Sequence, residues 1–236
     1  MGYTECKYCN HNGAGNYCQQ CGEPYHQHRI TVGHMLHEVV HLFTHFDKGF
    51  LYTLKRLITS PGIMQKEYIN GTRKNYQKPF SMYFVCGTIT ALAVYWISKG
   101  MEHFYKADNV EETHFFQHYF VLTQMCVVPL YAAVNWLAYS RSKYNYAEFL
   151  VLLLYNISAL FLLTILTNLV KLIVGEFETE YIEMGIVVMY NIITYINFFN
   201  EGNRIVVILK TLVTSALCFT IARYAMLFVI KVILKH

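Results

Sequence analysis

Residues 147–175, AEFLVLLLYNISALFLLTILTNLVKLIVG, form an apolar stretch with two charged side chains, Glu148 and Lys171. About 20 residues of helix are enough to cross the hydrocarbon core of a bilayer, so this stretch is long enough for a transmembrane helix. The whole chain agrees, because 55% of its residues are hydrophobic and only 14% are charged. The sequence therefore predicts an all-α integral membrane protein.

Five apolar segments are long enough to span a bilayer. They run roughly over residues 80–98, 115–139, 147–175, 181–200 and 205–234. The third and the fifth exceed the minimum length, which a tilt or an extension beyond the bilayer would accommodate. We expect a transmembrane helical domain over residues 80–236 with about five spans, and solutions with four spans or six crossings stay open.

The loops between these segments alternate in charge. The N-terminal region and the turn at 140–146 are basic, whereas the loops at 99–114 and 176–180 are rich in carboxylates. The positive-inside rule then places residues 1–79 in the cytoplasm and the two acidic loops outside. No apolar stretch stands near Met1, so no secretory signal peptide is expected. The predicted location is the bacterial inner membrane, with several passes and a cytoplasmic N-terminus.

Residues 1–28 contain two C-x-x-C pairs, Cys6-Lys7-Tyr8-Cys9 and Cys18-Gln19-Gln20-Cys21. Each pair can fold as a tight knuckle, and Gly22 suits the left-handed turn that follows the second pair. Four thiolates make a closed tetrahedral site, so these cysteines predict a structural Zn²⁺ ion in a zinc ribbon. Two disulfides or unpaired thiols are the alternative. Cys86, Cys126 and Cys218 stand singly in apolar runs and are interpreted as core residues.

Residues 29–79 show the pattern of amphipathic helices. One helix is predicted over Thr31–Asp47, a second over Phe50–Thr59, and a third from Ser60-Pro61 to about Asn70-Gly71. Basic residues follow before Pro79, so we expect these helices on the inner membrane surface, in contact with the lipid bilayer. Packing against the ends of the spans is a compatible alternative.

The segment before the first apolar stretch carries several short motifs. They include Tyr17-Cys18-Gln19-Gln20-Cys21-Gly22-Glu23, Asp47-Lys48-Gly49-Phe50-Leu51, and a Y-x-x-G-x-R-x-x-Y-x-x-P run from Tyr68 to Pro79. In these motifs the chain resembles the bacterial membrane-protein family catalogued as domain of unknown function 3667, over roughly residues 3–83. The resemblance implies the architecture but carries no activity with it.

A possible catalytic motif is the H-E-x-x-H of His37, Glu38 and His41, which lies on a predicted helix. Zinc proteases bind the metal with two such histidines and use the glutamate as general base. Here, however, His34, His37, His41 and His45 already line one face, so one common surface residue completes the motif. A polar helix face is the preferred interpretation, and a metalloprotease or a metal- or proton-sensing histidine face are alternatives.

Polar residues also recur inside the apolar segments, among them Asn135, Asn156, Asn168, Asn191 and Asn197. Ionisable groups at depth usually face a partner or a water-filled cavity. Glu183 with Arg223 or Lys171, and Glu148 with Lys210, are the predicted pairs. Such groups hold helices together or line a polar substrate path.

We therefore expect a non-enzymatic scaffold or accessory subunit whose zinc module contacts a cytoplasmic protein partner. A transporter that uses the polar interior is the first alternative, and a membrane metalloprotease the second. Nucleic acid is not an expected partner, because the net charge is only +4 and Lys7 is the sole Lys or Arg among the first 28 residues. The oligomeric state is not predicted.

Overall fold

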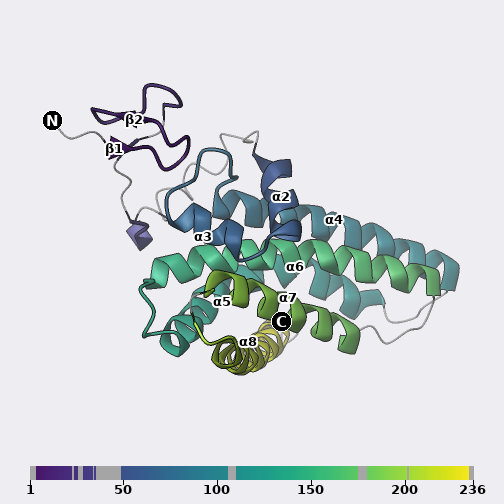
Figure 1. The fold of residues 1–236 in the computed structure, drawn as a ribbon. Helices are drawn as coiled ribbons and strands as arrows, with labels where there is room; N and C mark the ends of the chain where they lie inside the picture. The colour runs from purple at the N-terminus through teal and green to yellow at the C-terminus, as the bar shows by residue number, and fades with distance from the viewer. Residues whose placement is uncertain are drawn as a thin grey trace.

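The computed structural model describes residues 4–22, 24–25, 29–33, 35, 49–105, 110–174, 180–200 and 202–233. It shows a helical body with a small two-stranded module near the N-terminus (Figure 1). The elements are β1 (Thr4–Glu5), β2 (Asn12–Gly13), α2 (Phe50–Thr59), α3 (Ile63–Ile69), α4 (Pro79–Tyr105), α5 (Val110–Ala138), α6 (Tyr146–Val174), α7 (Glu180–Phe198) and α8 (Arg204–Ile233). The predicted helix over Thr31–Asp47 lies mostly outside the described residues.

Helices α4 to α8 coincide with the five predicted apolar segments. Within the described residues, four stretches are long and apolar enough to cross a membrane: Pro79–Met101, Val121–Ala138, Tyr146–Val170 and Arg204–Val229. The apolar part of α7, Ile182–Phe198, is shorter. The structure therefore supports a multi-pass membrane protein with four candidate spans, and the predicted span at 181–200 falls short of that length.

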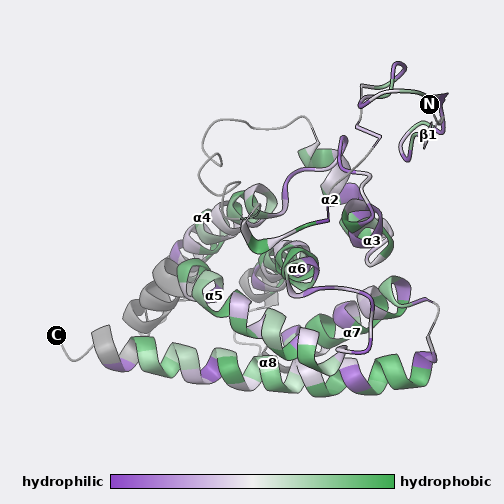
Figure 2. Cartoon of the chain, turned by 90° about the vertical axis from the view of Figure 1, so that its left-hand side faces the viewer, coloured by the Kyte–Doolittle hydropathy of each residue, from purple (hydrophilic) through white to green (hydrophobic). Residues whose placement is uncertain are grey.

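Helix α6 is the centre of the helical body. Figure 2 looks nearly along it and shows α4, α5, α7 and the α2–α3 pair around it, and α6 contacts all five helices. Phe149, Val151, Leu152, Leu154 and Tyr155 are almost completely buried. A helix that is apolar around its whole circumference suits a buried position, and α6 has the highest mean hydropathy of the candidate spans, 2.5. Its C-terminal half is less covered, and Leu166 and Val170 are exposed there.

Helix α8 has a different direction from α6. It is seen nearly end-on in Figure 1, where α6 lies across the view, and it lies across the view in Figure 2, where α6 is seen end-on. It packs against α5 and α7, and the Tyr139 hydroxyl donates to the Val207 carbonyl at 3.1 Å. The other side of α8 exposes large apolar side chains, including Ile205, Leu209, Val213 and Phe228. Lipid or another protein surface would cover such a face.

The second predicted helix is confirmed, because α2 covers Phe50–Thr59. The third begins later than predicted: the N-cap of α3 is Gly62, not Ser60. The chain first turns sharply at Gly62, whose φ is +83°. This turn docks on α7, because the Asn197 side-chain amide donates to the Pro61 carbonyl at 2.9 Å. The alternative in which these helices pack on the ends of the spans is thus what the structure shows.

Gly62 is required at this turn for two reasons. Its positive φ is a conformation that L-residues rarely adopt. A Cβ atom at this position would also lie 2.1 Å from the Thr194 carbonyl oxygen and 2.9 Å from the Phe198 backbone nitrogen of α7. Backbone atoms cannot move aside as a flexible side chain can, so any larger residue must separate α3 from α7.

We predict that Gly62→Ala lowers the thermal midpoint of the protein in detergent. The strained backbone alone costs roughly 1–3 kcal/mol, and the clash with α7 adds to it. Gly185→Ala is the matched control, because Gly185 has no positive φ and a Cβ there meets nothing within 4 Å. A midpoint that Gly62→Ala leaves unchanged relative to Gly185→Ala would contradict the close packing of this turn on α7.

Candidate functional site

The N-terminal module is built from two matching knuckles. In each, the residue after the second cysteine donates its backbone NH to the first cysteine: Asn10 to the Cys6 carbonyl at 2.9 Å, and Gly22 to the Cys18 carbonyl at 2.8 Å. Both residues have a left-handed backbone, with φ of 58° at Asn10 and 75° at Gly22. The role predicted for Gly22 is confirmed. Asn10 was missed, although Asn is one of the non-glycine residues that tolerate this conformation.

The knuckles bring Cys6, Cys9, Cys18 and Cys21 together as predicted. Their sulfur atoms all lie within 4.8 Å of one another. The Cys6–Cys21 and Cys9–Cys18 sulfur pairs are each 3.5 Å apart, too far for disulfides, and all four cysteines are free. A tetrahedron of sulfurs around a metal at 2.3 Å has edges of about 3.8 Å, so the four thiols fit a metal ion.

The electrostatics of Cys18 favour the form that binds metal. Burial raises the pKa of the Cys18 thiol, but hydrogen bonds from the backbone NH groups of Cys21 and Gln20 lower it to about 6 overall. The lowered pKa of Cys18 favours its thiolate, which is the state that ligates metals. Tyr25 packs against Cys6 and Cys18 and, together with them, forms the small core of the module.

The module is attached to the loop between α3 and α4. Lys7 Nζ donates to the Asn70 carbonyl at 3.2 Å, and the Asn75 amide donates to the Tyr8 hydroxyl. Lys74 donates to the Cys21 carbonyl and lies over the Tyr8 ring, 5.7 Å from its centroid. These contacts join the cysteine module directly to the helical body.

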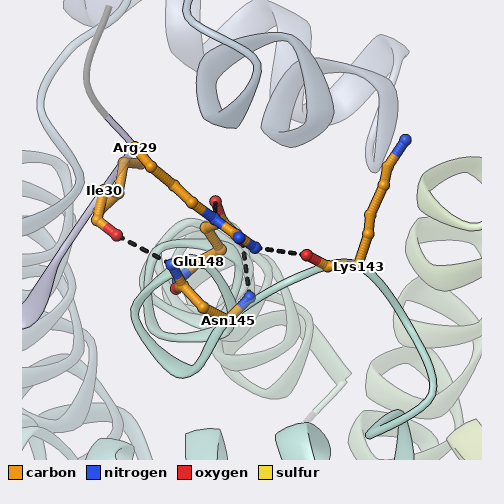
Figure 3. Close-up of polar contacts among 5 residues, drawn as sticks. All are labelled: Arg29, Ile30, Lys143, Asn145 and Glu148. Atoms are coloured by element: carbon orange, nitrogen blue, oxygen red, sulfur yellow. Dashed lines mark hydrogen bonds and ion pairs between the residues drawn. The ribbon is translucent and has the colours of Figure 1, made fainter.

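A second attachment lies at the start of α6 (Figure 3). Arg29 forms a two-bond ion pair with the buried carboxylate of Glu148, with distances of 2.8 Å and 2.9 Å, and also donates to the Lys143 carbonyl. Glu148 accepts from the Asn145 backbone NH at 2.7 Å, and the Asn145 side chain accepts from the Glu148 NH at 2.9 Å. This reciprocal pair is a capping box that begins α6.

Two of the predicted charge pairs are wrong. Glu148 pairs with Arg29, whereas Lys210 donates to the Ala138 carbonyl at 2.8 Å and lies over the Tyr139 ring. Arg223 is exposed on α8 and forms no ion pair with Glu183 among the described residues. The side chain of Lys171 lies outside the described part of the structure.

A cavity of about 370 Å³ lies between α5, α6, α7 and α8. Ligand pockets commonly have volumes of about 300–1,000 Å³. One part of its wall is apolar, with Leu153, Ile157, Leu160, Phe161, Val187 and Phe219. Most of the lining surface is apolar, and the polar residues along it are Gln124, Tyr131, Asn135, Asn156, Thr164, Glu183, Asn191, Tyr195, Thr214 and Ser215. Such a mixed wall suits a ligand that has both apolar and hydrogen-bonding parts.

Hydrogen bonds hold the amide groups of this wall in place. Asn156 donates to the Asn191 side-chain oxygen at 2.8 Å, and Tyr195 donates to the Asn135 side-chain oxygen at 2.7 Å. Gln65 of α3 donates to Asn156 at 3.4 Å and accepts from the Gly62 NH at 2.6 Å. The predicted role of Asn residues as links between helices thus holds for Asn135, Asn156 and Asn191, and Asn156 extends the network to α3.

Comparison with known protein families matches part of the chain. Residues 47–91 match the model of a family described as "Protein of unknown function (DUF3667)". The predicted family resemblance is therefore confirmed over these residues. No curated protein and no solved structure matches the chain. We call residues 47–91 the DUF3667 segment.

The structure explains the motif from Tyr68 to Pro79 in the DUF3667 segment. Arg73 donates to the Tyr68 carbonyl at 3.2 Å, and its guanidinium carbon lies 5.6 Å from the centroid of the Tyr68 ring. Gly71 has a φ of 114°, which favours glycine, and Pro79 begins α4. Tyr76 donates to Glu67, which also pairs with Arg56 at 2.7 Å. The motif thus fixes the loop that receives the cysteine module.

The histidine motif is not tested by the structure. His34, His37, Glu38, His41 and His45 all lie outside the described residues. Sequence reasoning also missed Arg29 as the partner of Glu148 and Gln65 as the partner of Asn156. The pairs are separated by 119 and 91 positions. No periodicity of the sequence relates residues so far apart.

We predict that Arg29→Gln destabilises the protein by roughly 1–3 kcal/mol, because it leaves the buried Glu148 carboxylate with only its helix-cap hydrogen bonds. Arg141→Gln is the matched control. It also removes one positive charge near the start of α6, but Arg141 is exposed and does not bind Glu148. Thermal unfolding in detergent measures the difference. Equal midpoints for the two variants would contradict an ion pair that stabilises the start of α6.

Proposed function

We propose that this chain is a non-enzymatic membrane protein that binds a small amphipathic ligand in the cavity between α5, α6, α7 and α8, as a carrier does. The observation that supports this proposal is the set of polar groups in the otherwise apolar wall of that cavity. It has amides on α5, α6 and α7, hydroxyls on α8 and one carboxylate, Glu183. This favours the transporter alternative over the scaffold that the sequence alone suggested.

The chemistry of the wall limits the class of ligand. Asn191 accepts one hydrogen bond, from Asn156, and the described residues provide no acceptor for its own NH₂ group. Asn191 would thus offer a hydrogen-bond donor to the ligand. The ligand that fits carries a hydroxyl or amide group next to an apolar part.

For the cysteine cluster we propose Zn²⁺. Four thiolates in a closed tetrahedral arrangement are the usual ligands of structural zinc, and no coordination position is left for catalysis. The metal would hold the two knuckles together, because Cys6, Cys18 and Tyr25 are too small a core to fold residues 4–25 by themselves. The zinc-held module would then keep its place on the α3–α4 loop.

A scaffold role is the second candidate. Tyr17 in the loop between the knuckles is 66% exposed, and exposed aromatic residues are frequent anchors in protein interfaces. A cytoplasmic protein partner at this loop is compatible with a ligand in the cavity. The bacterial inner membrane and a cytoplasmic N-terminus remain part of the proposal, supported by the charges of the loops.

Thiol labelling tests the cavity. The variant carries Cys86→Ala and Cys126→Ser, so that Cys218 is the one cysteine outside the cluster. The labelling reagent is a small, charged methanethiosulfonate that does not enter lipid. We expect Cys218 to be modified, because it lines the cavity and a polar wall admits water. Peptide mass spectrometry measures the modified fraction.

Two variants give the control. Ala222→Phe should slow the modification roughly tenfold or more, because Ala222 lines the cavity and the larger ring fills part of it. Ala216→Phe, on the exposed side of α8, should leave the rate unchanged. No modification of Cys218 at all, in a protein that stays folded, would mean a dry cavity and would refute the proposal.

The metal proposal predicts one zinc per chain by elemental mass spectrometry. Cys18→Ser with Cys21→Ser should remove it, because two thiolates do not hold zinc tightly, while Cys126→Ser should retain it. His37→Ala with His41→Ala should also retain it. Two zinc ions per chain, one of them lost with the histidines, together with proteolysis that depends on Glu38, would favour the metalloprotease alternative instead.

A further inference from the structure

Helix α2 exposes one of its faces. Thr53 and Leu57 are buried, whereas Leu51 and Ile58 are 74% and 68% exposed. Lys55 lies between Leu51 and Ile58 in the sequence, about one turn from each, and it is exposed as well. Residues three and four positions apart share a helix face. The exposed face of α2, made by Leu51, Lys55 and Ile58, is thus mainly apolar with one positive charge near its centre.

This face lies at the level of the candidate membrane spans. Helices α2 and α3 both contact α6 and lie beside its first half in Figure 1. Gln65 of α3 donates to Asn156, which is ten residues, or about 15 Å, from the beginning of the candidate span Tyr146–Val170. The end of α2 is held by the apolar part of α7, because the Tyr190 hydroxyl donates to the Leu57 carbonyl at 3.1 Å. Lipid that surrounds α6 and α7 would therefore reach the exposed face of α2.

The length and the direction of α2 are those of a helix in the plane of a membrane. With ten residues it is too short to span a bilayer. Figure 1 shows it running across the direction of α6, which contains a candidate span. An amphipathic helix that lies crosswise to the spans can place its apolar side chains at the boundary between headgroups and acyl chains.

The turn after α2 meets a requirement of the lipid environment, in which backbone polar groups need partners within the protein. Each backbone NH and carbonyl group of Ser60, Pro61 and Gly62 has such a partner, apart from proline, which has no NH. The partners are Arg56 and Met64 for Ser60, the Asn197 side chain for Pro61, and the Gln65 side chain and Lys66 for Gly62. The turn can therefore lie next to acyl chains without an unpaired backbone group.

Lys55 is a charge that α2 leaves for an external partner. The neighbouring Arg56 donates to both carboxylate oxygens of Glu67 at 2.7 Å. The Lys55 ammonium, in contrast, forms no hydrogen bond or ion pair with another residue in the part of the chain that the structure describes. A lysine on an apolar surface extends its ammonium group to the headgroups while its methylene groups stay among apolar neighbours. The phosphate of an anionic lipid matches this charge.

We propose that the exposed face of α2 is a lipid-binding surface in one leaflet of the bilayer. Leu51 and Ile58 lie among acyl chains, and the Lys55 ammonium binds the phosphate of an anionic lipid. No residue of α2 lines the cavity between α5, α6, α7 and α8, so lipid binding here does not depend on a ligand in that cavity.

Fluorescence quenching in nanodiscs tests where α2 lies. The full chain carries Ile58→Cys in a background with Cys86→Ala, Cys126→Ser and Cys218→Ser, and mass spectrometry verifies one nitrobenzoxadiazole label per chain. We expect strong quenching by lipids with a nitroxide on the acyl chain and little quenching by aqueous iodide. Ala14→Cys, at an exposed position of the cysteine module, is the control and should show the reverse.

Native mass spectrometry tests the role of Lys55. It measures the phosphatidylglycerol that the protein retains from nanodiscs, with phosphatidylcholine as the reference lipid. Lys55→Gln should weaken phosphatidylglycerol binding roughly fivefold, which is the effect of one lysine near an anionic surface, and Lys55→Arg should retain it. Lys99→Gln, near the far end of α4, is the matched control that loses the same charge and should bind like the wild type.

Three results would overturn the proposal. Iodide quenching at position 58 as strong as at position 14 would place α2 in water. Protection of position 58 from both quenchers would mean that protein, not lipid, covers this face. Equal retention of phosphatidylglycerol by Lys55→Gln and Lys99→Gln would show that Lys55 binds no headgroup.

Discussion

The burial of α6 is the constraint on which the rest of the structure depends. The first half of this helix is surrounded by α2, α3, α4, α5 and α7, so Glu148, Asn156 and Ser158 are buried against protein. Buried polar groups need partners, and the partners come from distant parts of the chain. Arg29 neutralises Glu148 in the first turn of α6, and Gln65 and Asn191 bind Asn156 deeper in the helix. The contact of Gln65 with Asn156 also fixes the DUF3667 segment on the helical body.

Much of the architecture follows from local sequence signals. The apolar runs predict α4 to α8, the amphipathic pattern predicts α2, and the C-x-x-C spacing predicts the cysteine cluster. What the sequence does not give is the direction in which each helix faces. Helix α8 is apolar all round, so nothing in its pattern indicates that it crosses α6 steeply, that Arg223 is exposed, or that Lys210 caps the end of α5 instead of pairing with Glu148. The cavity arises in part from this unpredicted placement of α8, which contributes Thr214, Ser215 and Phe219 to its wall.

The DUF3667 segment links the cysteine module to the wall of the cavity between α5, α6, α7 and α8. Its loop receives the cysteine module, because the Asn70 carbonyl accepts a hydrogen bond from Lys7. Its α3 helix places Gln65 against Asn156 in the cavity wall. A metal in the cysteine cluster would stabilise the module that the loop between α3 and α4 receives. A ligand in the cavity that contacts Asn156 would therefore meet a group that also binds α3.

The central claim is that α3 belongs to the core of the molecule. Its seven residues are too few for a stable helix in isolation, so its backbone hydrogen bonds persist only if it is docked. Hydrogen–deuterium exchange of peptides covering Ile63–Ile69, measured by mass spectrometry in nanodiscs, tests this directly. The structure predicts exchange as slow as that of residues 147–161 in α6, because Met64, Gln65, Tyr68 and Ile69 are buried. Complete exchange of α3 within seconds, while α6 stays protected, would contradict the account.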